Sequence, residues 1–174
     1  MKWLIISVIT AFGLTSVAYA ADPAPSIAAR TGVAVTTDAF LTQVAGGNQF
    51  EIDSSKLALT KTKSELLRAF ATQMIADHSA AAIKFKHAIT DAGLKVPPMG
   101  TDAKHLAIID DLRKKDAVSF DKAYIDAQYK AHVDTVALFE AYADKGDNPR
   151  IRQFAQEMLP TLRGHLEHVS KLRR

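Results

Sequence analysis

The chain has 174 residues, and its 22 Lys and Arg against 19 Asp and Glu give a formal net charge of +3. This small excess is scattered along the chain apart from the final "KLRR", so the basic stripe of a nucleic-acid-binding protein is missing. The sequence contains no cysteine, which excludes thiol chemistry, disulfide bonds and cysteine-based zinc sites.

Residues 1–20, "MKWLIISVITAFGLTSVAYA", have the three parts of a secretory signal peptide. Lys2 gives the positively charged start, residues 3–17 form the apolar stretch, and Ala18-Tyr19-Ala20 is a small-residue cleavage site. We expect cleavage after Ala20, and the alternative is a retained membrane anchor. The sequence therefore predicts export across the inner membrane.

Residues 21–36 contain proline and alanine without any periodicity, so we expect a flexible N-terminal lead. Residues 37–174 suit one domain of ordinary size. No later apolar run approaches the length of a membrane span, so none is predicted once the signal peptide has been removed.

Two helices are predicted in the first half of this domain, where helix-forming residues dominate. The first covers 38–59. The second starts near Ser64, a favourable N-cap residue, and ends at Gly93, the glycine expected just past a helix C-terminus.

Two more helices are predicted in the second half. One covers 120–144 with Ser119 as its N-cap, and the last begins at Asn148 and Pro149 and continues to the C-terminus. The connection over 94–119 is long and contains a short helical stretch at 101–116.

The two helix pairs resemble each other in sequence. The segment "RAFATQM" at 68–74 aligns without a gap with "RQFAQEM" at 152–158, in a register that matches Ser64 with Asn148. We interpret this as a duplicated hairpin, and chance similarity between amphipathic helices is the alternative.

The predicted fold is all-α: a ferritin-like four-helix bundle of two helical hairpins, joined by a long crossover that contains a short helix. The connection over 94–119 is long enough to travel the length of a bundle. The alternative is an up-down-up-down bundle with an added fifth helix.

Each predicted long helix carries one ionisable residue on its inward side: Glu51, His78, His132 and His165. Bundle-core metal sites are built from carboxylates and imidazoles in this way, and these groups suit iron, manganese, zinc or copper. We therefore predict these four residues as candidate metal ligands. The Glu-x-x-His signature of di-iron proteins is missing, because the residues three before the histidines are Ile75, Tyr129 and Leu162.

Two other interpretations of these four residues stay open. They could form a structural polar network, in which Glu51 pairs with His132 or with a tyrosine, or they could be unrelated and partly exposed. Asp77 is expected to face solvent or a loop, because neighbouring residues on a helix point about 100° apart.

Several separated segments resemble the exported bacterial domain-of-unknown-function family 4142. They are "FLTQVAGGNQFEIDSSKLA", "RAFATQMIADHSAA", "FDKAYIDAQYKAHVDTVALF" and "NPRIRQFAQEMLPTLRGHL", in this order. The resemblance implies a ferritin-like helical fold and a periplasmic or envelope location. It implies no reaction, because the family carries no established activity.

Three functions are compatible with these features. The favoured one is a non-catalytic periplasmic or envelope binding or stress-related module. The alternatives are a metal-binding or metal-dependent redox protein that uses the inward Glu/His cluster, and a purely structural or partner-binding bundle. An envelope protein or a second copy of the chain is a possible partner, and paired carboxylates for acid–base catalysis are not found on the inner faces.

Overall fold

The computed structural model describes residues 35–174, so the predicted signal peptide and almost all of the predicted lead lie outside the described residues. Within 35–174 the chain forms helices and no strands. The helices are α2 Thr37–Lys61, α3 Glu65–Asp91, α4 Ala103–Lys114, α5 Ala117–Lys145 and α6 Pro149–Leu172. None of these five helices is both long and apolar enough to span a membrane.

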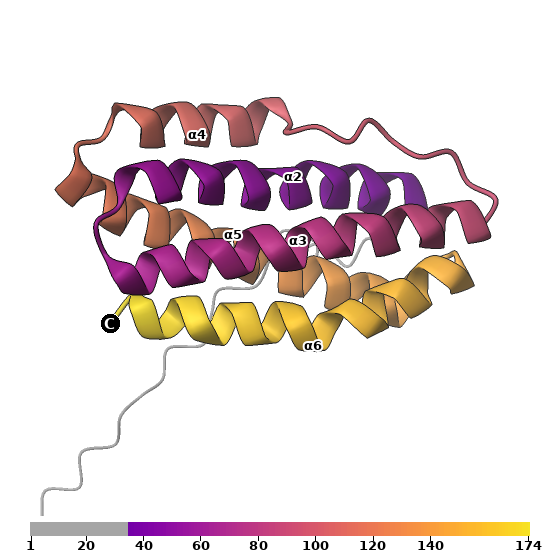
Figure 1. Ribbon diagram of the computed structural model, residues 1–174. Helices are drawn as coiled ribbons and strands as arrows, with labels where there is room; N and C mark the ends of the chain where they lie inside the picture. Colours follow the sequence, from indigo (N-terminus) through magenta and orange to yellow (C-terminus); the bar gives the residue numbers. More distant parts are fainter. Residues whose placement is uncertain (1–34) are drawn as a thin grey trace, which may run out of the picture.

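The four long helices form a bundle of two hairpins, α2–α3 and α5–α6 (Figure 1). After α3, the chain runs back along the outside of the bundle through α4, so that α5 starts at the same end as α3. Helices α3 and α5 are therefore parallel, and α4 covers α2 and α5. This arrangement confirms the ferritin-like topology and excludes the up-down-up-down alternative.

Local chemistry fixes most helix ends where the sequence predicts them. Ser64 accepts a hydrogen bond from the Leu67 backbone N–H, and Asn148 accepts from the backbone N–H of Ile151. Gly93 has a positive φ of 68°, and the Leu94 N–H bonds back to the Ile89 carbonyl at 3.0 Å. Helix α3 thus ends in a Schellman motif, which favours glycine at this position.

The start of α5 corrects one prediction. The N-cap is Asp116, whose carboxylate accepts a hydrogen bond from the Ser119 backbone N–H at 2.8 Å, so Ser119 lies inside the first turn. Aspartate and serine are both good N-caps, and with Asp116 as the N-cap the helix is longer by most of a turn than with Ser119.

The buried side chains divide into two apolar clusters, one toward each end of the bundle. One cluster contains Phe40, Phe85 and Phe139, and the other contains Phe70, Met74 and Phe120. Between the clusters lies a belt of buried polar side chains contributed by all four long helices, namely Glu51, Ser54, Ser55, His78, Gln128, His132 and His165. This polar belt is where a functional site is to be sought, because buried polar groups need partners.

Candidate metal centre

Three histidines meet in the polar belt, one each from α3, α5 and α6. His78, His132 and His165 are 6%, 1% and 3% exposed. Their ring centroids lie 5.9 Å (His78–His132), 5.4 Å (His78–His165) and 5.4 Å (His132–His165) apart. Each ring offers one nitrogen within 4.8 Å of the nitrogens offered by the other two. We call these residues the histidine trio.

Each ring of the trio is held by one oxygen acceptor. His78 Nδ1 lies 3.0 Å from Asn48 Oδ1, His132 Nδ1 lies 2.9 Å from the Gln128 carbonyl oxygen, and His165 Nε2 lies 2.8 Å from Asp77 Oδ2. Because carbonyl and carboxylate oxygens only accept, the hydrogen of each neutral ring sits on the nitrogen that faces its acceptor.

The other nitrogen of each ring, His78 Nε2, His132 Nε2 and His165 Nδ1, is buried and has no hydrogen-bond partner. These atoms carry the lone pairs of the neutral rings. Metal-bound histidines in proteins show this same division, with one nitrogen on the ion and the other donating to an oxygen.

The electrostatic environment keeps the trio neutral near pH 7. Burial lowers the pKa of His78 well below its ordinary value, and the neighbouring rings of His132 and His165 lower it further. Burial also lowers the pKa of His132 to about 4. Burial lowers the pKa of His165, although its bond to Asp77 acts in the opposite direction. Neutral imidazole is the form that binds metals.

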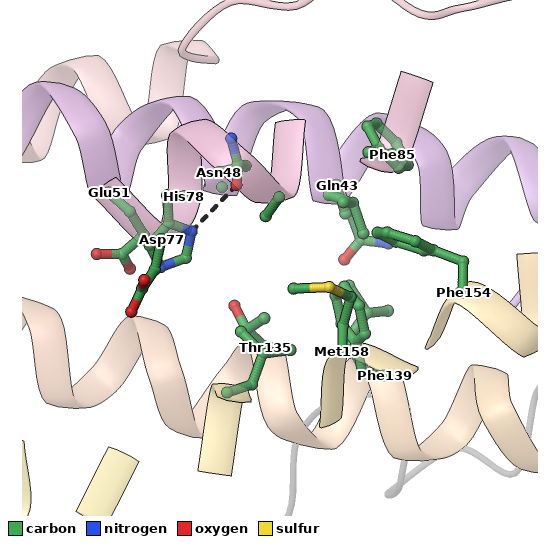
Figure 2. A pocket seen from close by; sticks show the side chains of 15 residues that line it. Gln43, Asn48, Glu51, Asp77, His78, Phe85, Thr135, Phe139, Phe154 and Met158 are labelled. Atoms are coloured by element: carbon green, nitrogen blue, oxygen red, sulfur yellow. Dashed lines mark hydrogen bonds between the residues drawn. The ribbon is translucent and has the colours of Figure 1, made fainter. Parts of the chain in front are cut away.

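A cavity of about 40 Å³ lies beside His78, among side chains of all four long helices (Figure 2). Glu51, Asp77 and His78 lie together at one end of it, and Phe154 lies toward the other end. Of the trio, His78 therefore borders a small open space.

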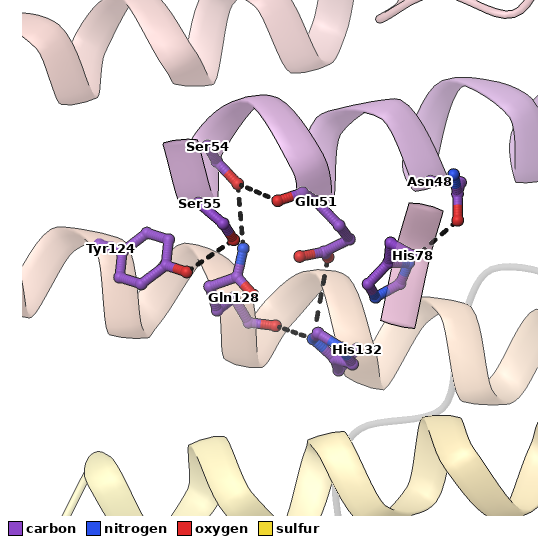
Figure 3. A network of polar contacts seen from close by, with 8 residues as sticks. All are labelled: Asn48, Glu51, Ser54, Ser55, His78, Tyr124, Gln128 and His132. Carbon is purple, nitrogen blue, oxygen red and sulfur yellow. Dashed lines mark hydrogen bonds and ion pairs between the residues drawn. The ribbon is translucent and has the colours of Figure 1, made fainter. Parts of the chain in front are cut away.

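Glu51 lies beside the trio and outside the group formed by the three rings. Its Oε1 atom is 3.8 Å from His132 Nδ1, and its Oε2 atom is buried without a hydrogen-bond partner (Figure 3). Burial raises the pKa of Glu51 to about 8, and the nearby Gln128 side chain opposes this shift to a smaller extent. In the metal-free protein at pH 7, this carboxyl group is therefore mainly protonated.

The polar belt continues past Glu51 toward the turn between α2 and α3. Gln128 Nε2 donates to Ser54 Oγ at 3.0 Å, and the hydroxyl groups of Ser55 and Tyr124 lie 2.8 Å apart. These contacts connect α2 with α5 and fix the turn of α5 whose carbonyl holds His132.

The residues around the trio fit a metal ion. Metal–nitrogen bonds of about 2.0–2.1 Å hold the nitrogens of a tetrahedral site roughly 3.4 Å apart. Nitrogens within 4.8 Å of one another reach this spacing by side-chain movements on the order of 1 Å. The three buried lone pairs and the three acceptors behind the rings match what such an ion requires.

The structure brings together three of the four predicted site residues and adds partners that the sequence analysis missed. Asp77 does not simply face solvent: it is 38% exposed and accepts the hydrogen bond from His165. Asn48 and Gln128 also went unnoticed. The signal for both was spacing, since Asn48 follows the buried Val44 by four residues and Gln128 lies midway between Tyr124 and His132.

Comparisons with known proteins agree with this fold. The family model described as "Domain of unknown function (DUF4142)" matches residues 22–172. A solved structure described as "CopM in the Cu(II)-bound form" is similar with a TM-score of 0.64 and 18% sequence identity, over 79% of this chain and 95% of that chain. At this identity the likeness concerns the fold. No curated protein matches the sequence significantly.

Proposed function

The chain belongs to the DUF4142 family, and we propose that it is a binding protein for one transition-metal ion, held between His78, His132 and His165. The observation that carries this proposal is the set of three buried ring nitrogens without partners, one on each ring. A purely structural network would satisfy such atoms with donors from the protein, because an unsatisfied buried polar atom costs about 1–3 kcal/mol.

Copper(II) is the ion that we expect to be held most tightly among iron, manganese, zinc and copper. Imidazole is a good ligand for iron, zinc and copper, and the affinity of a given site rises along the Irving–Williams series to a maximum at Cu²⁺. The fold is shared with a protein whose structure contains Cu(II), which supports the same choice. The ion would supply a centre of positive charge that the three imidazoles hold in place.

The proposed role is to hold the ion outside the cytoplasm. Export rests on the signal-peptide pattern of residues 1–20, and the periplasm or envelope is the expected location. Holding is favoured over turnover because the three donors project from helices and each ring is fixed by its acceptor, which preorganises the site. An envelope protein that delivers or accepts the ion is an expected partner.

Copper titration of protein purified without a histidine tag tests the proposal. We expect one equivalent of Cu(II) to bind in competition with a chelator of known affinity, and the melting temperature to rise. Ligand at 100 times its Kd stabilises the native state by about 2.7 kcal/mol. His78→Gln, His132→Gln and His165→Gln should each remove most of this effect.

The matched control is His87→Gln, because His87 lies on the exposed face of α3 and outside the trio. This variant should bind copper as the wild type does. If none of iron, manganese, zinc or copper binds or raises the melting temperature, the proposal is wrong. The polar belt would then serve packing specificity in a structural bundle.

A further inference from the structure

The histidine trio is buried, so an ion must pass between side chains to reach it. The three rings are at most 6% exposed. Toward the turn between α2 and α3, the apolar cluster with Phe70, Met74 and Tyr124 packs with these side chains 0% exposed, and such packing leaves no space for an ion. The cavity beside His78 lies on the other side of the trio, because its apolar walls, such as Phe139, belong to the other cluster.

Each ring of the trio either lines this cavity or touches a residue that lines it. His78 lines it directly. Asp77 also lines it, and its Oδ2 atom lies 2.8 Å from His165 Nε2. Glu51 lines it as well, and its Oε1 atom lies 3.8 Å from His132 Nδ1. Figure 2 shows His78, Asp77 and Glu51 at the same end of the cavity, so at most one side chain separates the cavity from each ring.

The cavity also extends to the surface of the bundle. Gln43 is exposed, Gly47 and Thr135 are half-buried, and all three are among its lining residues. The Asp77 side chain is 38% exposed. Because the walls include both exposed Gln43 and buried His78, the cavity spans the distance from solvent to the trio.

The charge and size of the cavity suit a cation. Glu51 and Asp77 place carboxyl groups in its wall, and none of the described residues that line it is Lys or Arg. The side chains of Gln43, Asn48 and Thr135 add oxygen atoms to the same wall. The cavity of about 40 Å³ has room for roughly three water molecules, since each needs about 10–15 Å³. A metal ion can therefore keep part of its hydration shell inside.

We propose that this cavity is the route by which the metal ion enters and leaves the trio, as a partly hydrated cation that contacts His78 first. This inference rests on the proposed metal binding and concerns its rates. The route determines how fast the ion arrives and departs, whereas the ligands determine how tightly it is held. Because the ion leaves by the path on which it entered, narrowing the cavity slows loading and release by the same factor and leaves the Kd unchanged.

Stopped-flow mixing of tag-free protein with Cu(II) tests the proposal. Quenching of tyrosine fluorescence follows loading, because the one tryptophan, Trp3, lies in the predicted signal peptide. Excess EDTA then measures release. Ala81→Leu fills the cavity from α3 and should slow loading and release by about tenfold or more each, while the Kd stays within about threefold. Ala80→Leu, the same change at an exposed position of the helix, should load and release copper as the wild type does.

Two further variants complete the test. Gly47→Leu fills the same cavity from α2 and serves if Ala81→Leu does not fold, since a Cβ atom at Gly47 would meet nothing within 4 Å. At low ionic strength, Gln43→Lys should slow loading by about threefold and Gln43→Glu should speed it by a similar factor, because the charge lies where the cation enters.

The inference and the proposed function can fail separately. Filled variants that bind copper and exchange it at wild-type rates would overturn the inference and leave metal binding intact. Equal loading rates for Gln43→Lys and Gln43→Glu would do the same. So would a filled variant in which only the release rate changes, because the substitution would then act on the ligands. If copper does not bind to the wild type, the proposed function fails and the inference fails with it.

Discussion

Replacing Glu51 by glutamine should stabilise the metal-free protein at neutral pH. Glu51 is 4% exposed, and its Oε2 atom has no hydrogen-bond partner. Burial raises its pKa from 4.5 to about 8. Glutamine has nearly the same shape and carries no charge at any pH, so the substitution removes the cost of keeping this group neutral.

The sign and size of the effect follow from proton linkage. In the unfolded chain the carboxyl group is ionised above about pH 4.5, whereas in the folded protein it stays protonated up to about pH 8. Unfolding therefore releases a proton between these values, so the contribution of Glu51 is fully present below pH 4.5 and is lost as the pH rises toward 8. From pH 4.5 to pH 7, at about 1.4 kcal/mol for each pH unit, the loss is about 3 kcal/mol.

Chemical unfolding at several pH values measures this contribution. Guanidinium chloride titrations followed by far-UV circular dichroism, with a chelator present, should show Glu51→Gln to be about 3 kcal/mol more stable than the wild type at pH 7. The advantage should shrink toward zero at pH 4.5. Because the comparison is a difference between two proteins, the titration of the histidines cancels to a first approximation.

The control is Glu157→Gln, an exposed acid on α6, for which the difference should stay within about 0.5 kcal/mol at every pH. A difference for Glu51→Gln that is the same at pH 4.5 and pH 7, or a variant less stable than the wild type at pH 7, would refute the reasoning. Either result would mean that Glu51 is ionised and well solvated or well paired in the native protein.

Four further predictions address the metal and the fold. Glu51→Gln should weaken Cu(II) binding by about 10–100-fold in chelator competition, because the carboxylate that offsets the charge of the ion is lost. Asp77→Asn should weaken Cu(II) binding by a similar factor and Asp77→Ala by more, because both substitutions weaken the hydrogen bond that holds the His165 ring. Unchanged copper affinity in these variants would contradict the role given to Asp77. Gly47→Ala should raise the free energy of unfolding by roughly 0.5–1 kcal/mol. Gly46→Ala should instead lower the free energy of unfolding, because the added Cβ would lie 2.5 Å from the carboxylate of Asp102, the N-cap residue of α4.

Periodicity and capping predicted the four long helices, although the start of α5 was placed three residues too late. The apolar repeats gave the direction of each inward face, and Ser64, Gly93 and Asn148 gave helix ends that the structure confirms. The length of the connection over 94–119 indicated the crossover, because a hairpin needs only a few residues.

The height of each residue along the bundle was harder to predict than its direction. A helical wheel places His78 and His165 inward but does not say whether they meet, since this depends on the offset between the two hairpins. In the structure, His78 lies between Met74 and Phe85 of the two apolar clusters, and His165 lies between Leu162 and Val169. Matching these flanking residues across helices would have predicted the common level.

Lateral contacts between neighbouring helices were the other feature that the sequence could not predict. Asp77 points about 100° away from His78 on its own helix, and this direction leads to α6, where it meets His165. A wheel drawn for one helix treats such a residue as outward, because it contains no information on the neighbour. The acceptor of the His165 proton could therefore be identified only with the bundle assembled.

The polar belt makes the metal-free bundle less stable than its apolar clusters would allow. The lowered pKa of His132 and the raised pKa of Glu51 both arise because burial disfavours charge, and each one weakens the fold in part of the pH range. Below pH 6.5 His132 is protonated in the unfolded chain but stays neutral where it is buried in the folded protein. Above pH 4.5 Glu51 is ionised in the unfolded chain but stays protonated in the folded protein. A bound cation would lower the pKa of Glu51 again, because a nearby positive charge favours the carboxylate. The cation would also give the three ring lone pairs a partner. Groups that oppose folding on their own and support it with a cation present are those expected of a ligand site.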